Sequence, residues 1–386
     1  MSKNVALKYV EEYNTSVIED KLREALFDLD LNQKLKPKMK VLIKADLHAS
    51  KSPDLAETTN PNIVHALVNI LSEMGIKCVL ADCPYGKFND GVLDDVYLNT
   101  GMLEVANLTN CELNNDLHTC ELEIPQGKLT KREVVLSRIF DVDGIINVGK
   151  LKFDDRLGYQ GCVANLFGFV PGELKTIAIN RMDTIEDYNN YLLDLYSSLN
   201  KKILFNVLDG IATLEARSTP RLLSCLAVSD NAFAIDSTML DILSIPKEES
   251  IIKTAIDRYM YDYDTVRCFG EKPSKFIVED FQKTNITNET QIHLNKRKQQ
   301  RYYNSHQARV KINPHNCKGC GICSEICPTG AIMMRFDKLG ELEAVVDYKK
   351  CIHCYKCRTA CPYHKVEMLT PAKYKAVKKE IDKQNT

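Results

Sequence analysis

The sequence predicts an α/β domain with a mainly parallel sheet, followed by a small cysteine-rich α+β domain. Short apolar runs alternate with helical patterns through most of the chain, and 386 residues are enough for more than one hydrophobic core. The cysteines mark the second domain, since eight of the 15 lie between Cys317 and Cys361. No apolar run approaches the roughly 18 to 20 residues that cross a bilayer, and the start lacks a signal peptide's apolar core. A cytoplasmic location is therefore expected.

The predicted α/β domain begins with a strand, a helix and a second strand. The run "KVLIKADL" at 40–47 is typical of a buried strand, the helix covers 61–75 with Asn60 as its N-cap, and the second strand covers 76–83. Such units normally build a parallel sheet with a right-handed crossover. Further strands are predicted at 143–150, 202–210 and 222–229, and further helices at 184–199, 231–243 and 248–261.

Polar residues follow the predicted strands, where open α/β sheets bind their ligands. They are Lys44, Asp46, Asp82, Cys83, Lys150, Lys152, Asp209 and Glu215. Lys150 and Lys152 are two apart on an extended segment, so they are candidates to clamp a carboxylate or phosphate, the alternative being that both are solvated. Asp209 is a candidate ligand or base, or part of a turn without chemistry. These three are the candidate catalytic residues. His48, His65 and His118 are isolated in the sequence and are expected in core or surface roles.

A cysteine repeat identifies the second domain. "CKGCGICSEICP" and "CIHCYKCRTACP" share the spacing CxxCxxCxxxCP. The repeat resembles bacterial-type ferredoxins with two [4Fe-4S] clusters, over residues 309–369, in which thiolates complete the coordination of each iron. In that family the fourth cysteine of each motif ligates the other cluster. The resemblance thus implies Cys317, Cys320, Cys323 and Cys361 on one cluster, and Cys351, Cys354, Cys357 and Cys327 on the other. Structural zinc, which usually takes two separated pairs, is the weaker alternative.

The charge is uneven along the chain. Residues 295–386 hold 19 basic against 8 acidic side chains, whereas residues 1–294 hold 32 against 44. A basic segment can indicate nucleic acid or an acidic membrane face, but each oxidised cluster with its four thiolates carries about −2 and offsets much of the excess. Nucleic acid is therefore not the expected partner. Residues 295–308 are interpreted as a basic linker and 370–386 as a basic tail.

A second resemblance covers roughly residues 39–245 and is carried by six short segments. They are "VLIKADL", "TTNP", "IINVGKLK", "ANLFGFVPG", "LDGIATLE" and "NAFAID". These segments resemble the family called domain of unknown function 362, some members of which carry the same ferredoxin module. The resemblance implies an α/β domain over 1–294, in which a substrate or cofactor would bind. It implies no defined activity.

Two main functions remain open, and a purely structural role for the clusters is a third, weaker alternative. In the first, the clusters relay single electrons to a substrate or cofactor bound by the α/β domain, which makes the chain a ferredoxin-linked oxidoreductase. In the second, the chain is an electron carrier or adaptor that docks between redox partners. A pocket lined by Lys150, Lys152, Asn165 and Asp209 and facing the ferredoxin module would favour the enzyme, whereas a closed or remote strand edge would favour the carrier. No GxGxxG or GxxxxGK[ST] motif signals a nucleotide, although a flavin remains compatible because many flavin sites carry no short motif. The sequence does not indicate an oligomeric state.

Overall fold

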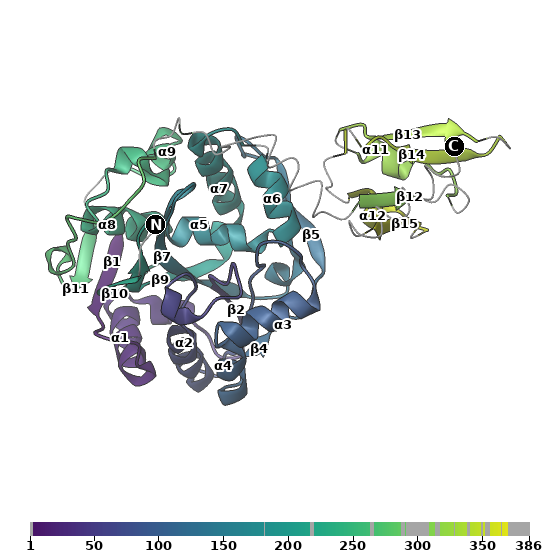
Figure 1. Cartoon of the computed structure of the whole chain (residues 1–386). Helices are drawn as coiled ribbons and strands as arrows, with labels where there is room; N and C mark the ends of the chain where they lie inside the picture. Colours follow the sequence, from purple (N-terminus) through teal and green to yellow (C-terminus); the bar gives the residue numbers. More distant parts are fainter. Residues whose placement is uncertain are drawn as a thin grey trace. The chain divides into compact units, whose positions relative to one another are not determined.

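The computed structural model of the protein describes two compact units, Met1–Ile292 and His293–Thr386, each considered by itself below (Figure 1). The described residues are 3–180, 182–216, 220–262, 266–286, 290, 309–312, 317–327, 329–337, 340–348, 350–351, 356–363 and 365–369. The predicted linker at 295–308 and the predicted tail at 370–386 lie outside them.

The N-terminal unit is built on a nine-stranded sheet. Its strands are β1 (Asn4–Tyr9), β2 (Lys40–Ala45), β3 (Lys77–Leu80), β4 (Glu112–Leu113), β7 (Gly144–Asp154), β8 (Gly158–Gln160), β9 (Ile203–Leu214), β10 (Pro220–Ser229) and β11 (Arg267–Gly270). They lie in the order β11-β1-β10-β9-β7-β2-β3-β4, with β8 paired to β7. The five strands from β9 to β4 are parallel, whereas β10 is antiparallel to β9 and β1 is antiparallel to β10. The predicted α/β class with a mainly parallel sheet is confirmed.

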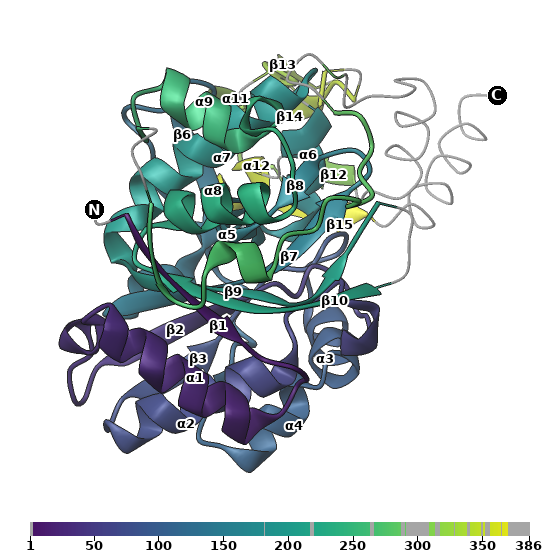
Figure 2. The same cartoon turned by 90° about the vertical axis from the view of Figure 1, so that its left-hand side faces the viewer.

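Helices cover both faces of this sheet (Figure 2). One face carries α1 (Thr15–Asp28), α2 (Pro61–Glu73), α3 (Asp90–Asn99) and α4 (Met102–Leu108), and the other carries α5 (Cys162–Asn165), α6 (Gly172–Asn180), α7 (Ile185–Leu199), α8 (Ala232–Ile242) and α9 (Ile251–Asp257). A separate hydrophobic core fills each side. Central strands buried on both faces need nearly continuous apolar sequence, which explains the run at the start of β7. A hairpin of β5 (Thr119–Glu123) and β6 (Arg132–Leu136) lies outside the main sheet.

Local sequence signals explain where several of the helices begin. Asn60 caps α2 by accepting from the backbone N–H of Asn62, and Thr184 forms a capping box with Asp187 at the start of α7. The helix predicted over 248–261 is wrong in extent. Ser250 interrupts it, because its side chain caps a new helix, α9, which ends at Asp257.

The C-terminal unit is a small α+β module. An antiparallel pair joins β12 (Arg309–Ile312) to β15 (Val366–Leu369), and a hairpin joins β13 (Ile332–Phe336) to β14 (Leu342–Val346). Two short helices, α11 (Ile322–Glu325) and α12 (Lys356–Ala360), each include one cysteine of a motif. The buried core of this unit contains Cys323 and Cys357. Cysteine side chains therefore share this core with apolar residues such as Val310, Ile332 and Val366.

No single helix among the described residues has the length and apolar composition to cross a membrane. One bent pair, Cys162–Phe169 with Gly172–Ile179, meets that test only when its two pieces are taken together across a 119° break.

Candidate functional site

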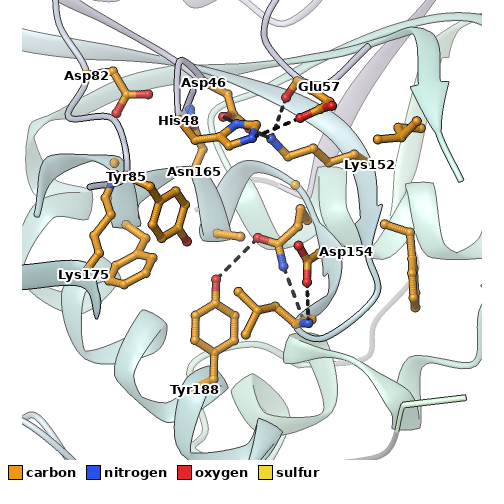
Figure 3. Close-up of a pocket in the computed structure, with 18 of the residues that line it drawn as sticks. Asp46, His48, Glu57, Asp82, Tyr85, Lys152, Asp154, Asn165, Lys175 and Tyr188 are labelled. Atoms are coloured by element: carbon orange, nitrogen blue, oxygen red, sulfur yellow. Dashed lines mark hydrogen bonds and ion pairs between the residues drawn. The ribbon is translucent and has the colours of Figure 1, made fainter. Parts of the chain in front are cut away.

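A cavity of about 130 Å³ lies at the carboxyl ends of β2, β3 and β7 in the N-terminal unit (Figure 3). Such a volume holds several water molecules or one small organic molecule. Lys44 and Asp46 come from the end of β2, Asp82 follows β3, and Lys152 comes from β7. Further lining residues include His48, Glu57, Tyr85, Asp154, Gln160, Asn165, Phe167, Lys175 and Tyr188. The cavity thus occupies the edge where a parallel sheet is expected to bind its ligand.

Four of these side chains form one group, called here the His48 cluster: Asp46, His48, Glu57 and Lys152. Lys152 Nζ lies 2.6 Å from Asp46 Oδ2 and 3.0 Å from His48 Nδ1. His48 Nδ1 is 3.0 Å from Asp46 Oδ1, and its Nε2 is 3.7 Å from Glu57 Oε2. Burial by itself would raise the pKa of Asp46, but Lys152 and His48 outweigh it and hold that pKa well below its usual range. Asp46 is therefore an ionised acceptor beside the imidazole.

A second group joins the sheet to the short helix α5. Lys44 is fully buried, with Nζ 3.1 Å from Asp82 Oδ1, and it donates to Asn165 Oδ1 at 2.9 Å. Asn165 in turn donates to the carbonyl of Lys44 and to Asn147. Each charge in this group has a partner, as buried charges require.

The third part of the wall combines aromatic rings with a lysine. Tyr85, Phe167 and Tyr188 line the cavity, with Phe167 edge-on to both tyrosines. Lys175, from the first turn of α6, is 1% exposed and donates to the carbonyl of Cys83. Its Nζ lies 4.9 Å from the Tyr85 ring centroid and 5.8 Å from that of Phe167. Burial lowers the pKa of Lys175, against the opposing effect of Asp82.

The structure separates the predicted catalytic residues. Lys152 and Asn165 line the cavity, but Lys150 and Asp209 do not; they form a buried ion pair of 2.9 Å beside it. Tyr13 donates to Asp209 at 2.7 Å, and burial together with Asp209 raises the pKa of Tyr13 well above its usual range. Of the four residues whose shared pocket would favour the enzyme, the cavity therefore includes two, Lys152 and Asn165. A catalytic role for Lys150, Lys152 or Asp209 stays a prediction.

His48, for which a core or surface role is expected from the sequence, is partly exposed and also lines the cavity. Cys83 and Cys162 are fully buried; burial raises the pKa of the Cys83 thiol to about 12 and that of Cys162 well above its usual range. Neither is a ready thiolate. Lys175, Tyr85 and Tyr188 were missed in the sequence. Only their contacts across the fold reveal them, since no short motif contains them.

In the C-terminal unit, four cysteines line a second, smaller cavity. They are Cys317, Cys320, Cys323 and Cys361, together with Lys318, Tyr363 and Lys365. This is the set that the ferredoxin resemblance implies for one cluster, including the cysteine contributed by the other motif. Within the described part of the chain, no three His, Cys, Asp or Glu side chains could hold a single metal ion. Four thiolates around a space, each for a different iron, suit a cubane.

The other implied ligand set is described in part. Cys327, Cys351 and Cys357 are among the described residues, and Cys354 lies outside them. The Cys327 sulfur accepts from the backbone N–H of Ala331 at 3.2 Å. Burial by itself would raise the pKa of Cys327, but backbone N–H groups of Thr329 and Ala331 outweigh it and lower that pKa. The lowered pKa favours the thiolate, which is the form that iron binds.

A parallel α/β unit with a polar cavity, joined to a unit whose cysteines suit [4Fe-4S] clusters, defines an iron–sulfur electron-transfer protein with an added α/β domain. The chain belongs to the family called domain of unknown function 362, whose model matches residues 41–241. A 4Fe-4S dicluster domain matches residues 296–365.

The chain is similar over part of its length to several known proteins. The thylakoid-associated protein sll1697 of Synechocystis is 27% identical over 254 residues, which are 64% of this chain and 76% of that protein. The ferredoxin-like protein in the nif region of Rhizobium leguminosarum is 40% identical over 58 residues, 14% of this chain and 83% of its own. The trichloroethene reductive dehalogenase of Dehalococcoides mccartyi is 43% identical over 56 residues, 12% of this chain and 10% of that enzyme. The lactate racemase apoprotein of Thermoanaerobacterium thermosaccharolyticum superposes with a TM-score of 0.41 at 13% identity, over 61% of this chain and 56% of that one.

Proposed function

We propose that the chain is an iron–sulfur reductase, in which electrons from two [4Fe-4S] clusters reduce a small molecule held in the cavity of the N-terminal unit. The His48 cluster is the main observation that supports the proposal. It places proton-bearing side chains at the ligand edge of a parallel sheet, in the same chain as a dicluster domain. When bound, the clusters supply electrons one at a time.

In this proposal, the residues of the His48 cluster supply and orient a proton for the reduction. A two-electron reduction takes up two electrons and two protons, and imidazole is the commonest proton-transfer group in enzymes. Asp46 orients the imidazole through Nδ1, while Lys152 keeps Asp46 ionised. One proton then comes from His48 and the other from water. Lys152 keeps a role in this proposal, whereas Lys150 and Asp209 support the fold beside it.

The volume of the cavity is evidence on whether a flavin binds there. About 130 Å³ is below the roughly 300 to 1,000 Å³ of pockets that hold drug-sized ligands. A small substrate that receives its electrons directly is therefore favoured over a flavin. In this proposal, a redox partner protein reloads the clusters.

Anaerobic purification tests the proposal. Iron and sulfide are quantified, an optical scan looks for flavin, and mass spectrometry identifies retained small molecules. We expect about eight irons per chain and a bound small molecule that Lys152→Met loses. Lys253→Met, on the surface of α9, should retain it. Eight irons with nothing bound would favour the alternative, a carrier or adaptor between redox partners.

A further inference from the structure

Lys175 is a buried ammonium group in the cavity wall that forms no ion pair within the described part of the chain. Of the described lining cations, Lys44 has Asp82 at 3.1 Å and Lys152 has Asp46 at 2.6 Å, but no carboxylate oxygen lies within 4 Å of Lys175 Nζ. An ammonium has three N–H donors, and one of them goes to the carbonyl of Cys83. The rings of Tyr85 and Phe167 flank the group.

The carboxylates of the cavity are already supplied with donors. Asp46 has Lys152, Asp82 has Lys44, and Glu57 has Lys51 at 3.6 Å and His48 at 3.7 Å. Asp154 accepts from the backbone N–H groups of Arg156 and Leu157. Asp154 has no cationic partner among the described residues, but it is partly exposed, whereas Lys175 is 1% exposed. The buried charge that lacks a counter-ion in this wall is therefore positive, although the lining residues include more acidic than basic groups.

We propose that the ligand of the cavity is a small monocarboxylate whose carboxylate pairs with Lys175. This inference rests on the proposed function, because the same ligand is taken to be the molecule that is reduced. A charge removed from water is costly until it is paired. One unmatched cation suits a monoanion better than a phosphate dianion. Apolar rings on both sides of the ammonium suit the hydrocarbon part of a short carboxylic acid.

Calorimetric titration of the cluster-loaded, oxidised full chain under nitrogen tests this inference. The probes are acetate and propionate, their neutral amides acetamide and propionamide, and inorganic phosphate. We expect at least one carboxylate to bind saturably, with its amide and phosphate at least tenfold weaker. Lys175→Met should weaken carboxylate binding at least tenfold. The matched control Lys253→Met, on the exposed side of α9, should leave it unchanged.

Three results would overturn the inference: no carboxylate binds, an amide or phosphate binds as tightly, or Lys175→Met binds like the wild type. If Lys175→Met fails to fold, the inference is still tested, because the affinities of the wild type for a carboxylate and for its amide can be compared. Binding by the oxidised protein needs no electrons. The titration can therefore succeed or fail independently of the reductase proposal. If the dithionite-reduced chain does not reduce the molecule that co-purifies with it, the reductase proposal is contradicted and the anion site stands, and reduction of a neutral molecule would do the reverse.

Discussion

Asp236 illustrates how one buried carboxylate outside the cavity positions a residue inside it. It is fully buried on α8 and accepts from the backbone N–H groups of Cys162 at 2.8 Å and Val163 at 3.0 Å, at the start of α5. A Cβ added at Gly161 would meet Asp236 Oδ1 at 2.3 Å, so this contact requires glycine there. Because α5 ends at Asn165, Asp236 helps to hold the amide that contacts Lys44.

This carboxylate predicts a pH dependence of stability. Burial raises the pKa of Asp236 to about 6, so the folded protein holds this proton more tightly than the unfolded chain. The resulting stabilisation is complete below the unfolded value and is lost as the pH rises through about 6. The difference in unfolding free energy between wild type and Asp236→Asn should therefore fall by about 1 to 2 kcal/mol from pH 5 to 7.

Urea denaturation followed by circular dichroism at pH 5, 6 and 7 measures this difference. Asp241→Asn, on the exposed side of the same helix, serves as the control and should show no such trend. A wild-type advantage over Asp236→Asn that stays constant with pH would contradict the assignment.

The crossed cluster ligation makes a prediction about pairs of cysteines. Cys317 and Cys361 line the same small cavity. The double variant Cys317→Ser with Cys361→Ser should therefore lose one cluster and keep about four of about eight irons. Cys351→Ser with Cys361→Ser should lose both clusters. Iron and sulfide analysis with electron paramagnetic resonance checks each variant, and the opposite pattern would show that each motif binds its own cluster.

Three elements meet at the buried ion pair of Lys150 on β7 with Asp209 on β9. Tyr13, in the connection between β1 and α1, donates to Asp209, and Lys150 donates to the carbonyl of Ala212. Removing one partner of a buried pair leaves the other charge uncompensated, at a cost of about 3 to 5 kcal/mol. We expect Lys150→Met to lower the unfolding free energy by about that amount.

Adding Asp209→Leu to Lys150→Met should recover most of the loss, because both charges are then gone. Lys253→Met, which removes an exposed pair with Asp257, should change stability by less than about 1 kcal/mol. Urea denaturation of the four proteins gives the comparison. If Lys150→Met were as mild as Lys253→Met, the pair would have no structural role.

The helices and strands that the sequence predicted are those marked by a pattern of neighbouring residues, such as an apolar run or a helix cap. The run at 40–47 and the cap at Asn60 identified β2 and α2, because a buried strand and a capped helix depend on neighbours in sequence. The antiparallel direction of β10 was not predicted. Its connection from β9 is too short for a crossover helix, so the two strands form a hairpin. The strand β1 was missed, because its pairing with β10 joins residues more than 200 positions apart.

At the scale of the whole molecule, the two parts differ in how far sequence determines the site. The cysteine spacing identifies three ligands of each cluster in the C-terminal unit, since those three are nearly contiguous, and the crossed fourth ligand followed from the family resemblance. The cavity of the N-terminal unit is assembled from β2, β3, β7, α5, α6 and α7. Lys44, Asp46, Asp82 and Lys152 were found because strand ends are predictable. Lys175 and Tyr188 come from helices whose placement depends on tertiary packing.

The central claim is that electrons from the clusters reach the cavity, and a stopped-flow experiment tests it most directly. The anaerobic full chain is reduced with dithionite, desalted and mixed with the molecule that co-purifies with it, while cluster absorbance reports reoxidation. We predict fast reoxidation in wild type and in Lys253→Met, and at least a tenfold slower rate in Lys152→Met with its cluster content unchanged. Equal rates in all three proteins would mean that the clusters react without the cavity, and would contradict the account.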